Sequence, residues 1–149
     1  MHIDKIKINN FKNYNSTEIS FSSKINFLYG KNGAGKTNLL DAIYYLSYGK
    51  SIINSFDIDN INHNKSFFTI NGSYSNNNYY RCVFEKPNSK KFFENDNRYD
   101  NLKKHIGKIP LVFVNPFDIN LIRNYSNSRR RFFDQIFSQI DEKYLENLI

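Results

Sequence analysis

Hydrophobic residues recur among polar ones over residues 1–10, and this pattern predicts an edge strand of a β-sheet. A second strand is expected near residues 19–21. Two further runs, 25–29 and 111–114, are apolar at most positions, which is typical of buried strands. We expect the run at 111–114 to be a central parallel strand.

Helical and strand patterns then alternate along the chain. Apolar residues recur at helical spacing over residues 39–46, whereas residues 50–65 have no clear period and predict a surface loop with one short turn. Strand patterns separated by Asn- and Pro-containing turns fill residues 66–98. This middle block predicts a small antiparallel β subdomain.

The last third of the chain is expected to be mainly helical. The pattern predicts a short helix at residues 100–105 and the start of a helical region at about 126–149, with Ser126 or Ser128 as its N-cap. Helices and strands interleaved in this way predict an α/β fold with a mixed sheet.

Residues 30–37 match the phosphate-binding pattern G-x-x-x-x-G-K-[ST] at every fixed position. A predicted strand precedes them and a predicted helix follows, so consecutive backbone N–H groups and a helix N-terminus can surround a phosphate. Lys36 is expected to bind the β- and γ-phosphates, and the Thr37 hydroxyl to ligate Mg²⁺. The alternative is a glycine-rich turn without a ligand. The predicted nucleotide-binding residues are Gly30, Lys31, Asn32, Gly33, Ala34, Gly35, Lys36 and Thr37.

Composition narrows the class of protein. The chain is 40% hydrophobic and 17% aromatic, which is typical of a folded domain. Its net charge of +7 fits a polyanionic partner such as nucleic acid, and equally fits a biased composition rich in Asn and Lys. The single cysteine, Cys82, excludes an internal disulfide, and no run is apolar enough for a signal peptide or a membrane span. We expect a cytoplasmic protein with no membrane partner.

Basic residues form a second candidate site. Arg129, Arg130 and Arg131 stand near the start of a predicted helix, where the helix dipole disfavours cations. We interpret them as a contact with the phosphates of DNA or of a nucleotide, or as partners of a buried acid; a solvated helix start is the alternative. Lys12 follows the first predicted strand, where it could reach the nucleotide or lie in solvent.

Acidic residues for nucleotide hydrolysis are not evident. P-loop enzymes that hydrolyse nucleotide place an Asp, often with a Glu, at the end of an apolar strand. The run at 111–114 ends instead in Asn115 and Pro116, and Asp118 lies farther on. We therefore expect no catalytic residue in this chain.

Four segments resemble the RecF family, which is a group of SMC-like ABC ATPases with a P-loop NTPase fold. They are NFKNY at 10–14, GKNGAGKTNLLDAI at 30–43, NPFDINL at 115–121 and SRRRFFD at 128–134. The phosphate loop alone is generic, but its combination with the first and last segments is specific. The resemblance covers essentially the whole chain.

The resemblance implies an ABC-type head that binds ATP and Mg²⁺ and forms an ATP-dependent homodimer. It implies binding of single-stranded or gapped DNA in repair, replication, recombination and the SOS response, and a role in loading the recombinase. Recombination mediator proteins are the implied partners. It places Lys12, where the family usually has Arg, and Asn13 at the nucleotide, and Asn115 where related ATPases have a glutamine that senses Mg²⁺. Ile53 stands where the family usually has Arg.

The family's helical arm, signature motif and Walker B acids lie farther along than the matched segments. We therefore expect an N-terminal part of an ABC-type head that is not an active ATPase alone. Three alternatives remain open. The chain could be part of another SMC-like or ABC ATPase with a different partner, a P-loop kinase or GTPase, or a fragment that folds poorly and has no function.

Overall fold

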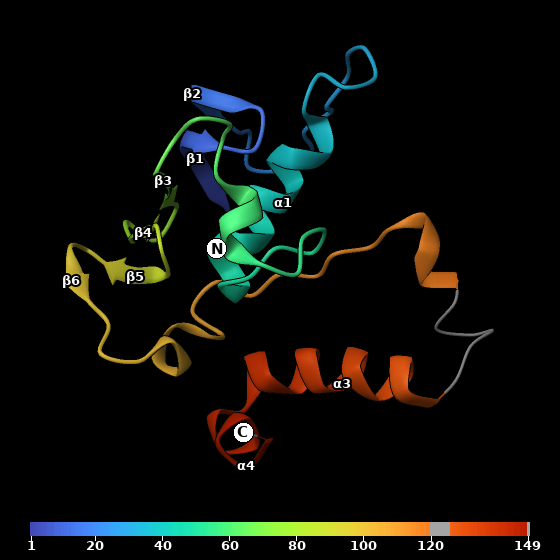
Figure 1. The fold of residues 1–149 in the computed structure, drawn as a ribbon. Coiled ribbons are helices and arrows are strands. Elements are labelled where there is room, and N and C mark those ends of the chain that lie inside the picture. Colours follow the sequence, from blue (N-terminus) through green and yellow to red (C-terminus); the bar gives the residue numbers. More distant parts are fainter. Residues whose placement is uncertain (120–125, 149) are drawn as a thin grey trace.

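The computed structural model describes residues 1–119 and 126–148 of the chain. Six strands form one sheet in the order β2-β1-β3-β4-β5-β6, and each neighbouring pair is antiparallel. Figure 1 shows helix α1 beside the sheet, with helices α3 and α4 lying apart from the strands. The strands are β1 (Ile3–Phe11), β2 (Tyr14–Ser20), β3 (Phe67–Tyr74), β4 (Tyr79–Glu85), β5 (Ser89–Glu94) and β6 (Asn97–Arg98).

The helical elements follow the expected order. The α-helices are α1 (Lys36–Tyr48), α3 (Ser126–Ile140) and α4 (Glu142–Leu148), and the short 3₁₀ turns are η1 (Asp57–Asn60), η2 (Leu102–His105) and η3 (Pro116–Ile119). The turn η1 confirms the single short turn predicted in the loop at 50–65. The turn η2 confirms the short helix predicted at 100–105, and α3 with α4 confirms the helical region.

Strand β1 lies inside the sheet, between β2 and β3, so the prediction that it is an edge strand is wrong. Its pattern arises from the two faces of the sheet. Ile6 and Ile8 are fully buried on one face, whereas Lys5 and Lys7 are exposed on the other. The alternation of apolar and polar residues in β1 therefore indicates that one face of the sheet is exposed to solvent, and it does not indicate an unpaired edge.

The core lies between the sheet and α1. Phe11, Tyr45 and Phe68 come from β1, α1 and β3, and their rings meet edge to face at centroid distances of 5.1 to 5.9 Å. Such geometry adds to the burial of apolar area, which is the main stabilising contribution. The other fully buried apolar residues of this core are Ile6, Ile8, Ala42, Leu46, Ile70 and Cys82.

The block at 66–98 forms the predicted antiparallel strands, and these strands continue the sheet that β1 begins. Ile8 of β1 lies opposite Ile70 of β3, which in turn lies opposite Cys82 of β4. The residues of this block therefore share one core with the phosphate-loop helix. Cys82 is a free, buried thiol, and its burial raises the pKa of the sulfur well above its usual value.

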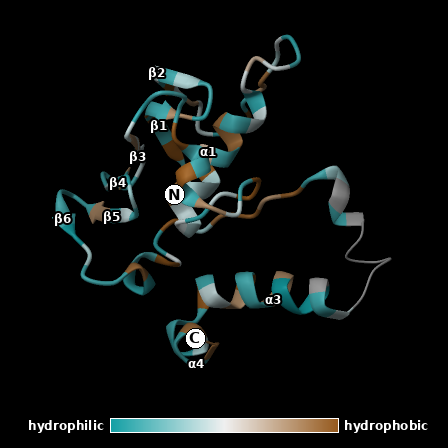
Figure 2. Cartoon of the chain, in the orientation of Figure 1, coloured by the Kyte–Doolittle hydropathy of each residue, from teal (hydrophilic) through white to brown (hydrophobic). Residues whose placement is uncertain are grey.

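The two apolar runs at 25–29 and 111–114 were expected to be buried strands, and the structure assigns no strand to either. The side chains of Phe27 and Val114 are 85% and 77% exposed. A parallel strand needs a hydrogen-bonded neighbour, and no strand within the described ranges pairs with either run. In Figure 2 the extended segment that precedes η3 is mostly hydrophobic.

Candidate nucleotide-binding site

The phosphate loop at 30–37 leads directly into α1, as the pattern predicted. Gly35 is the N-cap of α1 with a φ of 103°, a value that side chains other than glycine's disfavour. No side chain caps this helix end, and no acidic residue lies in the first turn. The free N–H groups and the positive end of the dipole therefore favour an anion here.

Lys36 and Thr37 are the last two residues of the phosphate loop and the first two of α1. The Nζ atom of Lys36 donates hydrogen bonds of 2.8 Å to the carbonyl oxygens of Gly30 and Lys31, so the side chain extends back across the loop. Thr37 is exposed at the start of α1. An ammonium group and a hydroxyl thus flank the free amides, which is the donor set that a triphosphate with Mg²⁺ requires.

The turn after β1 packs against the loop from outside. The hydroxyl of Tyr14 donates to the carbonyl oxygen of Gly35 at 3.1 Å, and Asn38 donates to the Oδ1 atom of Asn13 at 2.8 Å. Partial burial raises the pKa of the Tyr14 hydroxyl. Asn13 therefore lies against the first turn of α1, and its contact with a nucleotide, which the resemblance implies, stays a prediction. Tyr14 is a supporting residue that sequence reasoning did not assign to the site.

Lys12 is held by an acidic partner. Its Nζ atom lies 2.5 Å from the Oδ2 atom of Asp41, and the two side chains are 9% and 0% exposed. The sequence left Lys12 between a nucleotide contact and a solvated turn. The structure instead places it in a buried ion pair with α1.

Asn115 lies beside Asp118. The backbone N–H of Asn115 donates to Oδ2 of Asp118 at 2.7 Å, and its side-chain amide donates to Oδ1 at 2.9 Å. The carboxylate that follows the apolar run therefore organises the turn into η3. Asn115 reaches η3 through this contact, and its role toward Mg²⁺ stays a prediction.

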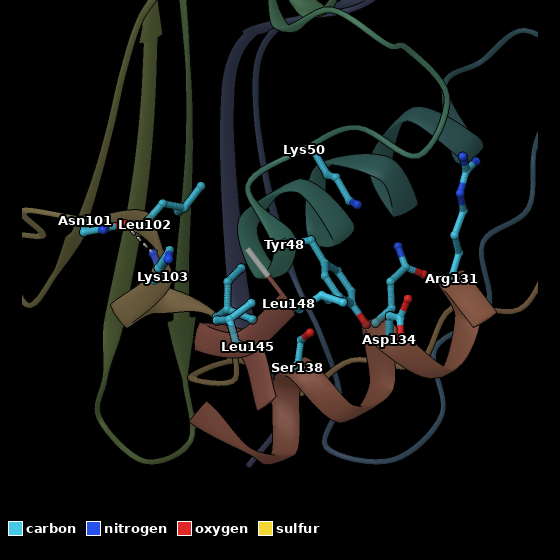
Figure 3. A pocket seen from close by; sticks show the side chains of 12 residues that line it. Tyr48, Lys50, Asn101, Leu102, Lys103, Arg131, Asp134, Ser138, Leu145 and Leu148 are labelled. Carbon is cyan, nitrogen blue, oxygen red and sulfur yellow. Dashed lines mark hydrogen bonds between the residues drawn. The ribbon is translucent and has the colours of Figure 1, made fainter. Parts of the chain in front are cut away.

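The three arginines lie in the first two turns of α3, which begins at Ser126. Arg131 lines a cavity of about 670 Å³ together with Lys50 and Lys103. Figure 3 shows the three cations on η2, on α3 and just after α1, and Leu145 of α4 also lines the cavity. The carboxylate of Asp134 lines the same cavity, so the lining contains three cations and one acid.

Helix α3 is tied to the end of α1. Gln139 donates to the hydroxyl of Tyr48 at 2.5 Å and accepts from the backbone N–H of Leu111 at 2.8 Å. Gln135 donates to the hydroxyl of Tyr44 at 3.0 Å. Burial raises the pKa of Tyr48 to about 12, so this hydroxyl stays protonated at neutral pH.

The described residues contain neither a cluster of metal ligands nor a helix that could span a membrane. Within residues 1–119 and 126–148, no cluster of three His, Cys, Asp or Glu side chains could hold a metal ion. In the same part of the chain, the helices are too short or too polar to cross a bilayer.

Most of the chain matches one protein-family model. The model described as "AAA domain" matches residues 5–148. The matched region contains the phosphate loop, nearly all of the sheet and the helices α1, α3 and α4.

Curated relatives match along the whole chain. The DNA replication and repair protein RecF of Flavobacterium johnsoniae is 43% identical over 152 residues, and that of Phocaeicola vulgatus is 45% identical over 153 residues. In each comparison all of this chain is covered, with 42% and 41% of the relative. The chain therefore spans less than half the length of these proteins.

Solved structures give the same result for the fold. The recombination mediator protein RecF-ATP of the RecFOR pathway superimposes with a TM-score of 0.90 at 27% identity, covering 99% of this chain and 42% of that one. An SMC ATPase structure superimposes with a TM-score of 0.70 at 22% identity over 91% of this chain, which shows the fold alone. The fold is thus that of the P-loop NTPase heads of RecF and SMC proteins. By its sequence, the chain belongs to the AAA domain family, and it is similar to RecF along its entire length.

Proposed function

We propose that this chain binds Mg·ATP at the phosphate loop as part of a RecF-like DNA repair protein. The observation that carries the proposal is the conformation of residues 30–37, with Lys36 across the loop and the uncapped N-terminus of α1 behind it. Similarity to RecF, which includes a RecF-ATP structure, supports ATP as the nucleotide.

Each part of the loop has a separate role in this proposal. The backbone N–H groups from Gly33 to Lys36 surround the phosphates, and Lys36 exchanges its two carbonyl acceptors for phosphate oxygens. The Thr37 hydroxyl is the proposed ligand of Mg²⁺, with Asn115 as a second candidate. When bound, Mg²⁺ supplies charge neutralisation at the β- and γ-phosphates.

Calorimetric titration with Mg·ATP tests the nucleotide site. Lys36→Ala removes a charged donor to two phosphates and is expected to weaken binding at least about tenfold. Lys65→Ala is the matched control, because Lys65 is an exposed lysine in a turn outside the loop. Equal affinity of the Lys36→Ala and Lys65→Ala variants would contradict the assignment.

For DNA, we propose that Arg129, Arg130 and Arg131 contact backbone phosphates. Arg131 lines its cavity together with Lys50, Lys103 and the acid Asp134, and no residue of the phosphate loop belongs to this lining. The test is fluorescence anisotropy with single-stranded and gapped duplex DNA at several salt concentrations. Replacing one phosphate-contacting arginine is expected to lower the slope of log K against log salt by roughly one. An unchanged slope in all three single variants would contradict it.

The remaining parts of the proposal concern the whole protein. We propose that the whole protein forms an ATP-dependent homodimer and cooperates with recombination mediator proteins to load the recombinase. We also propose that it is cytoplasmic and acts in DNA repair and the SOS response. The names of the RecF relatives and the SMC-like fold support these proposals. Sedimentation velocity with and without Mg·ATP tests the dimer, since a monomer under both conditions would contradict it.

A further inference from the structure

The most buried ion pair of the described residues joins the turn after β1 to α1. It consists of Lys12 and Asp41, whose charged atoms lie 2.5 Å apart. Asp41 follows Thr37 by four residues, so it lies about one helical turn beyond the proposed Mg²⁺ ligand. The pair therefore sits directly behind the phosphate loop.

The Asp41 carboxylate also organises the loop after α1. Its Oδ1 atom accepts the backbone N–H of Ile52, and its Oδ2 atom accepts the hydroxyl of Ser51, both at 2.7 Å. The Ser51 Oγ atom in turn accepts the N–H groups of Ile53 and Asn54, each at 3.0 Å. A fully buried carboxylate with these partners is well satisfied, as burial of a charge requires.

The backbone of Lys12 is fixed as firmly as its side chain. The residue has a positive φ of 50°. Its N–H donates to the carbonyl oxygen of Asn60 at 2.8 Å, and its own carbonyl accepts from the side chain of Asn62 at 2.7 Å. The next two residues, Asn13 and Tyr14, are those that contact the phosphate loop and the first turn of α1. The position of the Lys12 backbone therefore sets where Asn13 and Tyr14 contact the phosphate loop and α1.

We propose that Lys12 and Asp41 form a positioning pair for the phosphate loop, and that Lys12 supports nucleotide binding without contacting the nucleotide. The pair holds the turn so that Asn13 and Tyr14 stay against Asn38 and Gly35. Transfer of the Lys12 ammonium to a phosphate would leave Asp41 buried without its counter-charge, which is strongly unfavourable. The inference rests on the proposed function of the loop.

A double-mutant cycle separates positioning from direct contact. Mg·ATP affinity is measured by calorimetry for wild type, Lys12→Met, Asp41→Asn and the double variant, at a temperature where circular dichroism shows each to be folded. Lys12→Met leaves an unpaired buried carboxylate and is expected to weaken binding about tenfold or more, the scale on which supporting residues act. The double variant removes both charges and is expected to bind more tightly than Lys12→Met. Lys12→Arg keeps the pair and is expected to bind like wild type.

Three outcomes would overturn the inference. They are wild-type affinity in Lys12→Met, equal affinity in Lys12→Met and the double variant, and loss of binding in Lys12→Arg. If Lys12→Met does not fold, the double variant decides. Its binding should stay within about tenfold of wild type, whereas a loss as large as in Lys36→Ala would mean direct contact.

Failure of the proposed function is distinguishable from failure of this inference. If the wild-type protein does not bind Mg·ATP, the proposed function fails, and amide hydrogen exchange still tests the pair. Exchange of the Leu39 N–H, which donates to the carbonyl oxygen of Gly35 at 2.9 Å, is expected to be faster in Lys12→Met than in wild type, with slower exchange restored in the double variant. Equal exchange in all four proteins would overturn the positioning role.

Discussion

Alanine at Gly35 tests the contact between the turn and the phosphate loop. The φ of Gly35 is 103°, and a Cβ atom there would lie 2.7 Å from Nδ2 of Asn13 and 3.1 Å from the hydroxyl oxygen of Tyr14. Gly33 is the matched control, because its φ is also positive, at 81°, and a Cβ atom there would have no neighbour within 4 Å. Both substitutions strain the backbone, but only Gly35→Ala displaces the turn.

Backbone strain and the loss of hydrogen bonds both contribute to the expected destabilisation. Backbone strain at a positive φ costs about 1–2 kcal/mol in either variant. Gly35→Ala also disturbs the hydrogen bonds Asn38–Asn13 and Tyr14–Gly35, each worth about 0.5–1.5 kcal/mol. We therefore expect Gly35→Ala to lower the free energy of unfolding by about 2–5 kcal/mol and Gly33→Ala by about 1–2 kcal/mol.

Urea denaturation followed by circular dichroism measures both free energies. The side chain of Asn13 is the nearest group, so Asn13→Ala should cost less stability in the Gly35→Ala background than in wild type. Equal destabilisation by Gly33→Ala and Gly35→Ala would refute the reasoning. So would strict additivity of Asn13→Ala with Gly35→Ala.

Three further predictions concern the core and the helix contacts. Burial lowers the pKa of His105, whose Nδ1 atom has no hydrogen-bond partner within residues 1–119 and 126–148, so the unfolded chain binds the proton more strongly. Stability should therefore be full above about pH 6.5 and fall as the pH drops below it, and chemical denaturation of His105→Phe should show a weaker dependence over that range. Phe68→Ala should cost about 3–5 kcal/mol in urea denaturation because Phe68 is fully buried, whereas Phe67→Ala, at a 40% exposed neighbour, should cost under about 1 kcal/mol; equal costs would contradict the packing. Gln139→Ala removes the hydrogen bonds to Leu111 and should increase amide exchange in α3 but not in β1; unchanged exchange in α3 would contradict the proposed attachment.

The sequence predicted those elements whose evidence is local. The helix α1 and the strands β3 and β4 have clear apolar periods, and the phosphate loop has a strict pattern of residue types. These signals come from contacts between neighbouring parts of the chain, so they could be read without knowledge of the whole fold. The runs at 25–29 and 111–114 were different, because an apolar run becomes a strand only beside a suitable neighbour.

The candidate site was predicted in the same uneven way. The phosphate loop was evident from its residues, but the partner of Lys12 was not, since an ion pair across 29 positions has no local spacing. One signal was present: Asp41 stands between Leu40 and Ala42 on the apolar part of α1, where a carboxylate needs a buried partner. The pairing of Asp41 with Lys12 depends on how β1 packs on α1, and the periodicity of the sequence does not predict that packing.

Backbone amide chemical shifts during titration with Mg·ATP test the central claim most directly. If the nucleotide binds at the phosphate loop, the largest changes will occur at Gly33, Gly35 and Lys36, and Lys36→Ala will move their midpoint to an Mg·ATP concentration at least about tenfold higher. Changes confined to Lys50 and Lys103 at the basic cavity, with constant shifts in the loop, would contradict the claim. So would an unchanged midpoint of the titration in Lys36→Ala.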